Sequence, residues 1–588
     1  MLVRNGGMTM RSDTLIDETK SKPAGPVCSA SCYTQELYPF DALFSPILCG
    51  GLSLKNRIIA IPPVKLYGEK PEEFALSAAA GGAGLICIDG GFDSKLCDGV
   101  HAHGGRIFAT LAPEKPLSAG FRRIRPAVQS KLMCLQALDA VKIGCDGLCL
   151  DLRDVEYDQA VVLTGSVRRT VGADTPLMCR VSDSYSYTNI VTAGADMLSI
   201  EPSAKNAPWL CQPTEAMPAG CFLEYSRYAK SSVSVPVAAC GKLGYPDVAE
   251  AALREGMCDM VILQRTLLAD PEWCGKAQSG KVDDIIPYIN PLGRLLVNLR
   301  AKSGTRKHIA VIGGGVSGMS FALCAANRGH NVDLYESGSK LGGRLIAEAR
   351  PSFKADTLNY RHWLILRLCR AKNVQIFLNS YVDAAGLSGS VYDAIVFANG
   401  SRLPPLPDIS GWGDIPFVPL WVLASAPGGL QELGGKRIAV LGGGKSGCEC
   451  ALWLKSEKKA AKVTLIENGC EIMRDSTFFE HEWFKKVLKI QGIELMMSAE
   501  PLRITEGCLL LKQSCCAALV TAHSPDTFIR SIDCDMIVLA QEELADKTQF
   551  IQAQSTPTAA RLYCLAGSHY PCGIIGASRA AYELAQMI

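Results

Sequence analysis

Short apolar runs alternate with helix-like segments along the first half of the chain, from about Tyr38 to Trp273. Eight such runs stand out, at residues 57–63, 84–91, 106–111, 147–152, 176–181, 197–202, 236–241 and 260–265. They lack the period-two alternation of half-exposed strands, which is typical of parallel strands buried on both faces. Helical patterns such as PDVAEAALREG (246–256) fall between several of them. Eight strand–helix units predict a TIM barrel, with an open doubly wound sheet as the alternative.

The second half, from about Arg306, opens with a different pattern: a strand, a glycine-rich turn, a helix and a second strand. Gly313, Gly315 and Gly318 form a GxGxxG motif, and Glu336 follows at the end of the second strand. In dinucleotide-binding folds such glycines permit a tight turn and close approach of a pyrophosphate, and the acid binds a ribose hydroxyl. The N-terminus of the helix then stabilises the phosphate charge.

The same unit appears a second time, with Gly442, Gly444, Gly447 and then Glu467. Two complete motifs predict two dinucleotide sites. A glutamate suits a free 2′-hydroxyl and disfavours a 2′-phosphate, so the second site is expected to prefer NAD to NADP. The alternative at each site is a fold unit that keeps its glycines for the turn and binds no nucleotide.

Composition and charge exclude several classes of protein. Of 588 residues, 48% are hydrophobic and 20% charged, which predicts a large core rather than disorder. With 60 Lys and Arg against 58 Asp and Glu the net charge is +2, which argues against a nucleic-acid or basic membrane-binding surface. No run approaches 18 uncharged apolar residues and no secretory signal follows Met1, so we expect a cytoplasmic protein that does not span a membrane.

The chain carries 25 cysteines, an odd number without a signal peptide, which predicts reduced thiols. Cys87, Cys149 and Cys179 lie within apolar runs, where cysteine acts as a small hydrophobe. Residues 1–37 are polar and punctuated by Gly and Pro, and are expected to form a disordered extension.

Three further motifs precede the nucleotide units in a fixed order: LFSPILCGGLSLKNRIIAIPP (43–63), GGAGLICIDGG (81–91) and LLADPEW (267–273). This order resembles the flavin oxidoreductases related to Old Yellow Enzyme. Within them it is similar to the multidomain branch of 2,4-dienoyl-CoA reductase, 2-enoate reductase, trimethylamine dehydrogenase and the bile-acid steroid reductases. The resemblance covers about 38–588. It implies a small-molecule substrate and an electron path from NAD(P)H to FAD, through a [4Fe–4S] cluster, to FMN.

The resemblance also implies a division of the chain into domains. An FMN-type TIM barrel covers 38–275 and a linker covers 276–305. An FAD-binding domain is formed by 306–432 and 544–588, and it is interrupted by an NAD(P)H-binding domain at 433–543. Association into a homo-oligomer is left open.

Several residues match flavin contacts of that family. In the barrel these are Pro62, Arg180, Gly241, Gln264 and Arg265. A cation at the position of Arg180 would stabilise the anionic reduced flavin. The alternative for Arg180 is an ion pair at the edge of the core. In the second half, Gly343 and Arg344 of the LGGR stretch (341–344) match an FAD contact.

In the barrel and the segment that follows it, the chain departs from the family at three places. Relatives carry four cluster-binding cysteines after the LLADPEW motif, but here only Cys274 is present, so no [4Fe–4S] cluster and no other metal is predicted. Thr110 stands where relatives have a flavin-binding Gln. At the end of the fourth strand Asp151 and Tyr157 replace the usual His pair as candidate catalytic groups.

These observations support three interpretations. The first is a flavin-dependent NAD(P)H oxidoreductase that resembles the enoate and dienoyl-CoA reductases but has a reshaped barrel site. The second is an FAD- and NADH-dependent diaphorase in which the barrel is structural. The third is a non-catalytic paralogue that acts as a partner subunit.

Overall fold

The computed structural model describes residues 40–588 except for 64–65, 114–125, 184, 203–209, 211, 298–303, 384–385, 387–390, 406–408, 412, 427–432, 475, 506, 515–526, 542 and 566–571. The expected disordered extension, 1–37, lies outside the described residues. The chain divides into two compact units with their boundary between Arg294 and Leu295. The first is called the barrel unit below, and the second the nucleotide unit.

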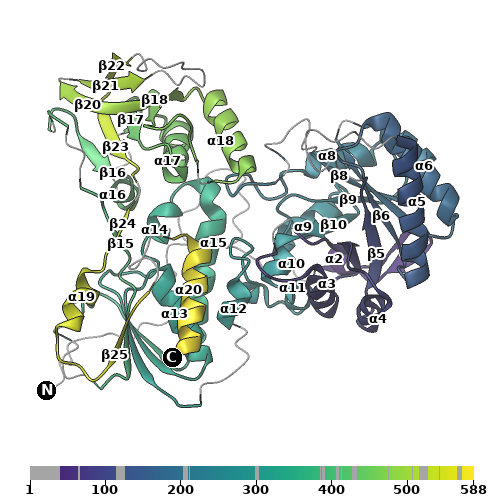
Figure 1. The fold of residues 1–588 in the computed structure, drawn as a ribbon, viewed down its shortest axis with the longest axis horizontal. Coiled ribbons are helices and arrows are strands. Elements are labelled where there is room, and N and C mark those ends of the chain that lie inside the picture. The colour runs from purple at the N-terminus through teal and green to yellow at the C-terminus, as the bar shows by residue number, and fades with distance from the viewer. Residues whose placement is uncertain are drawn as a thin grey trace. The chain divides into compact units, whose positions relative to one another are not determined.

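The barrel unit contains a closed barrel of eight parallel strands, and each predicted apolar run supplies one of them (Figure 1). The strands are β3 (Ile58–Ala60), β4 (Leu85–Asp89), β5 (Arg106–Leu111), β6 (Gly147–Asp151), β7 (Leu177–Ser182), β8 (Met197–Glu201), β9 (Val237–Ala239) and β10 (Met260–Leu263). Hydrogen bonding between β10 and β3 closes the ring. The prediction of a TIM barrel is therefore confirmed.

Helices surround these strands. The side chains on the two faces of each strand pack into two separate hydrophobic cores. The helices are α2 (Asp41–Phe44), α3 (Pro71–Ala80), α4 (Ser94–Ala102), α5 (Pro126–Ile143), α6 (Tyr157–Val171), α7 (Tyr187–Thr192), α8 (Leu223–Lys230), α9 (Pro246–Arg254), α10 (Arg265–Ala269) and α11 (Trp273–Gln278). Inward side chains such as Phe108, Cys149 and Met178 form the inner core. Outward ones such as Ile107, Leu148 and Leu177 pack in the outer core. Burial on both faces explains why the runs show no alternation.

A hairpin of β1 (Ile47–Cys49) and β2 (Leu52–Leu54) precedes the barrel and packs into its inner core. The Cys49 thiol lies 3.9 Å from the sulfur of Met197 and 3.8 Å from that of Met260. Cys87, Cys149 and Cys179 are buried free thiols, so in the described structure these cysteines serve as apolar core residues.

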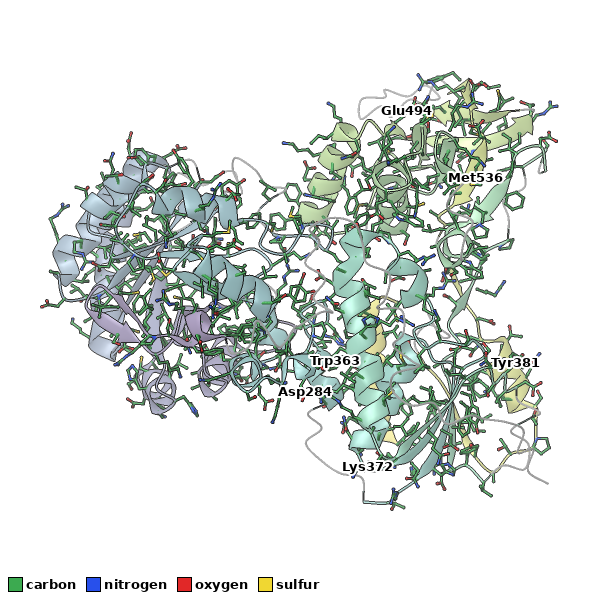
Figure 2. All side chains as sticks on the ribbon, turned by 180° about the vertical axis from the view of Figure 1, so that it is seen from behind. Asp284, Trp363, Lys372, Tyr381, Glu494 and Met536 are labelled. Atoms are coloured by element: carbon green, nitrogen blue, oxygen red, sulfur yellow. The ribbon has the colours of Figure 1, made fainter. Side chains whose placement is uncertain are left out.

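The nucleotide unit contains two five-stranded parallel sheets. The first has the order β13 (Val374–Phe377), β12 (Asn331–Tyr335), β11 (His308–Ile312), β14 (Ala394–Phe397) and β25 (Arg561–Cys564). Its helices include α13 (Val316–Asn327), α14 (Leu345–Glu348), α15 (Ala355–Arg370) and α20 (Ile574–Met587). Trp363 lies on α15 (Figure 2). Its ring stacks on that of Tyr360. The fifth strand, β25, follows all the strands of the second sheet in the chain.

The second sheet has the order β16 (Phe417–Pro419), β23 (Met536–Leu539), β17 (Arg437–Leu441), β18 (Lys462–Ile466) and β19 (Glu494–Met496). Figure 2 labels the first residues of β19 and β23, Glu494 and Met536. Strand β16 belongs to this sheet although it precedes the expected domain boundary at 433. The nucleotide unit also contains the helices α16 (Leu420–Ser425), α17 (Lys445–Ser456), α18 (Phe478–Ile490) and α19 (Thr548–Gln554).

Two smaller sheets belong to the same unit. One is an antiparallel sheet of β20 (Ala499–Thr505), β21 (Cys508–Ser514) and β22 (Thr527–Asp533). The other is the antiparallel pair of β15 (Ser401–Arg402) and β24 (Leu544–Ala545). The expected linker, 276–305, contains a 3₁₀ turn at Val282–Asp284 and α12 (Gly293–Val297). In the part of the chain that the structure describes, no helix is both long and apolar enough to cross a membrane.

Candidate functional site

The first glycine motif forms a tight turn between β11 and α13. Gly313 has a φ of +111°, and a Cβ there would lie 2.4 Å from the carbonyl oxygen of Ala398. A Cβ on Gly318 would lie 1.9 Å from the carbonyl oxygen of Gly313. Gly315 differs, because a Cβ there would meet no atom within 4 Å. Gly315 is also the N-cap of α13, so open space adjoins the positive end of a helix, as a pyrophosphate requires.

The carboxylate of Glu336 is held beside this turn. One oxygen accepts a hydrogen bond from Gly314 N at 2.8 Å and the other from Gly338 N at 2.6 Å. The LGGR stretch packs on the same turn, since Gly342 N donates to Gly314 O at 2.9 Å. A Cβ on Gly343 would lie 3.0 Å from the Cα of Gly315. The predicted residues of the first motif are thus brought together in one cradle.

The second motif repeats this geometry between β17 and α17. Gly442 has a φ of +111°, and a Cβ on Gly447 would lie 1.9 Å from Gly442 O. Gly444 faces open space and caps α17. Glu467 accepts from Gly443 N at 2.6 Å and from Gly469 N at 2.7 Å. Both turns therefore retain the features that fit a dinucleotide: an open glycine, a helix N-terminus and an anchored carboxylate.

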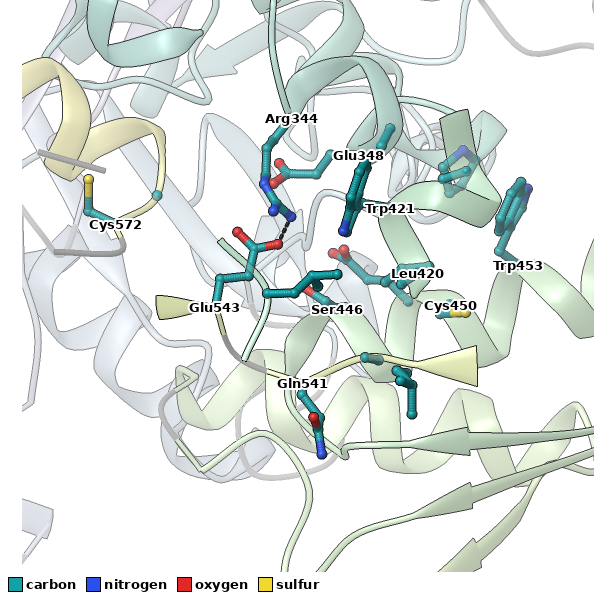
Figure 3. A pocket seen from close by; sticks show the side chains of 18 residues that line it. Arg344, Glu348, Leu420, Trp421, Ser446, Cys450, Trp453, Gln541, Glu543 and Cys572 are labelled. Atoms are coloured by element: carbon teal, nitrogen blue, oxygen red, sulfur yellow. Dashed lines mark ion pairs between the residues drawn. The ribbon is translucent and has the colours of Figure 1, made fainter. Parts of the chain in front are cut away.

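A cavity of about 570 Å³ lies in the nucleotide unit between elements of both sheets (Figure 3). Its walls come from α14, α16, the first turns of α17, the residues after β23 and the residues that precede α20. Arg344 forms an ion pair with Glu543 in this cavity, and its guanidinium lies 5.6 Å from the ring centre of Trp421. The predicted FAD contact Arg344 thus lines a cavity that helix α17 of the second motif also lines.

A buried ion pair supports one wall of the cavity. Lys354 is 4% exposed, and its ammonium lies 2.9 Å from a carboxylate oxygen of Glu449. Glu449 lies on α17, two residues after Gly447, and lines the cavity. Sequence reasoning missed this pair, although an acid two residues after the last motif glycine was a visible signal.

At the barrel mouth, Arg180 lies in a closed network of charges. It is 4% exposed, and it donates to both carboxylate oxygens of Glu201 at 2.8 Å. Asp151 lies 3.4 Å away on the other side. The alternative interpretation of Arg180, an ion pair at the edge of the core, is the arrangement observed.

A second arginine completes this network, which we call the mouth network: Asp151, Arg153, Arg180 and Glu201. Arg153 donates to Asp151 at 2.8 and 2.6 Å and to Glu201 at 2.7 Å. Arg153 and Glu201 were not predicted, because the ion pairs of Glu201 with Arg153 and Arg180 join residues that are 48 and 21 positions apart in the sequence.

The arginines of the mouth network lower the pKa of both of its carboxyl groups. Burial alone would raise the pKa of Asp151, but Arg180 and Arg153 outweigh burial and hold that pKa well below its usual range. The same balance of burial against Arg180 and Arg153 lowers the pKa of Glu201. Asp151, a predicted catalytic group, is therefore ionised at neutral pH and accepts hydrogen bonds rather than donating a proton there.

The other residues predicted for the barrel site lie on or beside several different elements of the barrel. Tyr157 begins α6, and its hydroxyl accepts a hydrogen bond from the Asn189 side chain at 2.6 Å, with no contact described to the mouth network. Thr110 is buried on β5, and its hydroxyl has no partner among the described residues. Pro62 follows β3 and is half-buried. Gln264 precedes α10, while Gly241 follows β9 with a φ of +99°.

Comparison with known proteins identifies the proteins that this chain resembles in sequence. The profile of the pyridine nucleotide-disulphide oxidoreductases matches residues 307–541. A metal reductase from Desulforamulus reducens is 29% identical over 542 residues, which cover 72% of this chain and 79% of the relative. A cinnamate reductase from Clostridium sporogenes is 27% identical over 425 residues, which cover 68% of this chain and 60% of the relative.

A solved structure supports the fold. The 2-naphthoyl-CoA reductase in complex with 2-naphthoyl-CoA superposes with a TM-score of 0.77 at 18% identity, covering 93% of this chain and 100% of that one. Fourteen curated proteins match significantly in all. The chain is therefore similar over most of its length to multidomain flavoenzymes related to Old Yellow Enzyme, and it is an oxidoreductase with a pyridine nucleotide-binding domain.

Proposed function

We propose that the protein is an FAD-dependent oxidoreductase that oxidises NADH, and that its reaction takes place in the nucleotide unit. The first glycine turn, with Glu336 and the LGGR stretch, would hold FAD. The second turn, with Glu467, would hold NADH. Each assignment is supported by an open glycine at a helix N-terminus and by a carboxylate placed for a ribose.

The cavity is the observation that carries this proposal. Its volume of about 570 Å³ lies in the range of roughly 300–1,000 Å³ that small-molecule sites occupy. It is lined from one side by Arg344 of the first motif's loop and from the other by α17 of the second motif. Bound FAD would supply an acceptor for the hydride of NADH.

The chain's own residues contribute charge and position. The Glu449 carboxylate lines the cavity, where it would favour the positive charge that develops on the nicotinamide as hydride leaves. Lys354 holds that carboxylate in place and acts as a positioning residue. Trp421 and Leu420 add apolar surface to the wall of the cavity.

We further propose that the chain binds no [4Fe–4S] cluster. Cys274, the one cysteine near the family's cluster segment, lies in α11, and burial raises the pKa of its thiol to about 12. A cluster needs thiolates from four cysteines. Iron analysis of protein purified without oxygen tests this, and about four irons per chain would refute it.

The electron acceptor is proposed to be a molecule that diffuses to the nucleotide unit. The relative named a metal reductase suggests an oxidised metal complex as one such acceptor. A ferric chelate is therefore the acceptor to assay first, with a quinone as the organic alternative.

The proposal is tested with Glu449→Gln, which keeps the shape of the side chain and removes its charge. Stopped-flow mixing with NADH without oxygen should show flavin reduction slowed at least about tenfold, with FAD content unchanged. Glu494→Gln is the matched control, because Glu494 is paired with Lys462 at 2.8 Å and lies outside this cavity. Equal reduction rates in the parent protein and both variants would contradict the proposed site.

A further inference from the structure

We propose that the barrel mouth holds the mouth network in place of FMN, so that electrons leave the protein directly from the flavin of the nucleotide unit. This inference rests on the proposed function and specifies its electron route. It departs from the FMN expected from the sequence. It follows from the ion pairs and hydrogen bonds that the described residues of the barrel unit make with one another.

The first step concerns charge. An arginine can stabilise an anionic reduced flavin only if its guanidinium is available to it. Arg180 is 4% exposed and already donates to both oxygens of Glu201, which is 6% exposed. Moving Arg180 to a flavin would weaken the pairing of a buried carboxylate, which is unfavourable.

The second step concerns the balance of the whole network. Two guanidiniums, of Arg153 and Arg180, face two carboxylates, of Asp151 and Glu201, and the four groups together carry no net charge. Ser199 adds a further hydrogen bond to Glu201 at 3.1 Å. The network spans the carboxyl ends of β6, β7 and β8, which is the end where TIM barrels bind their ligands.

The third step concerns the end of the barrel where a flavin phosphate would bind. The ring of Phe222 fills the space beside Gly241, since a Cβ on that glycine would lie 2.7 Å from it. The Lys242 ammonium donates to the carbonyl oxygen of Glu215 at 2.8 Å and also to that of Met217.

Arg265, the remaining predicted cation, is likewise engaged by the protein. It donates to Pro213 O at 3.0 Å, and its guanidinium lies 5.0 Å from the ring centre of Tyr288. A phosphate needs free N–H donors and uncompensated positive charge. Carboxylates compensate the charges of Arg153 and Arg180, and the donors of Lys242 and Arg265 are directed to the protein's own carbonyl oxygens, so the described residues do not fit FMN.

The electron balance then needs no barrel cofactor. NADH loses a hydride, which carries two electrons and one proton. With a one-electron acceptor such as a ferric chelate, one NADH reduces two ferric ions to ferrous ions, and NAD⁺ and one proton are released. No bond to iron has to form or break inside the barrel.

The test is the flavin content of the native full-length protein, measured by acid release and chromatography. We expect about one FAD and no FMN per chain. Equilibrium dialysis against excess FMN should load none, which excludes loss during purification. About one FMN per chain, before or after dialysis, would overturn the inference and leave the proposed function standing. Absence of FAD would instead overturn the proposed function.

A variant gives a second readout. Glu201→Gln should lower the thermal midpoint of the protein, because it weakens the mouth network, while NADH-driven reduction of a ferric chelate stays within about twofold of the parent. A parallel loss of ferric reduction in a variant that remains folded would show that electrons pass through the barrel, and would contradict the inference.

Discussion

Glu336 and Glu467 occupy equivalent places in two copies of one turn. Each carboxylate accepts hydrogen bonds from two backbone amides, one in the glycine turn and one just after its own strand. An ionised carboxylate can accept about four hydrogen bonds, so each keeps capacity for ribose hydroxyls. The glutamates therefore both brace the turn and present acceptors to a nucleotide.

Replacement of Glu467 should change the choice of nucleotide. Glu467→Ala removes a charged acceptor of the ribose hydroxyls, which should weaken NADH binding by roughly tenfold, or about 1.4 kcal/mol. NADPH should bind better than before, because a carboxylate that repels the 2′-phosphate is gone. The Arg474 guanidinium, which lies against Gly469, is available to pair with that phosphate.

Fluorescence titration with both nucleotides measures the effect. The double variant Glu467→Ala/Arg474→Ala is the control, and it should lose the gain in NADPH affinity. An unchanged ratio of NADH to NADPH affinity in Glu467→Ala would show that this carboxylate does not face the ribose.

At the scale of elements, each glycine turn contains one glycine that the packing of the turn requires and another that faces the open space proposed for the nucleotide. Gly447 is needed for the turn itself, since its Cβ would strike Gly442 O. Gly444 has an ordinary extended conformation, with a φ of −67° and ψ of −178°, and faces open space. Alanine is therefore compatible with the fold at 444 and incompatible at 447.

This difference predicts that Gly444→Ala folds normally but binds NADH poorly, because the added methyl group occupies the path of the pyrophosphate. We expect a thermal midpoint within about 2 °C of the parent and at least about tenfold weaker NADH binding. Gly447→Ala should lower the thermal midpoint as well. Full NADH affinity in Gly444→Ala would show that the open space beside this glycine is not the nucleotide site.

The mouth network joins three adjacent barrel strands, so its parts should behave as a unit. Arg180→Met leaves Glu201 and Asp151 partly uncompensated and should lower the free energy of unfolding by about 3–5 kcal/mol. Arg180→Met/Glu201→Leu removes both buried charges and should recover much of that loss. Denaturant unfolding of the parent, both single variants and the double variant measures the coupling. Additive effects would show that the two residues do not depend on each other.

At the scale of the molecule, periodicity and spacing were enough to predict the architecture. The eight apolar runs became the barrel because buried parallel strands have a recognisable composition, and both glycine motifs were found because their spacing is set by the turn. The beginning of the second sheet was missed at β16, since three residues carry too little pattern to assign to one sheet or the other.

The barrel site could not be predicted in the same way. Arg180 was singled out by its place on a strand, but its role depends on Glu201, which follows on the next strand. Arg153 and Lys242 likewise take partners that only the closed barrel brings near. Sequence spacing reports contacts within an element, whereas these contacts join different elements.

The most direct test of the account is a titration of the full-length protein with NADH in the absence of oxygen, followed by the visible absorbance of its bound flavin. The account predicts that about one equivalent of NADH per chain bleaches all the flavin, because one FAD accepts one hydride. Flavin that stays oxidised, or a requirement for two equivalents because a second flavin sits in the barrel, would contradict it.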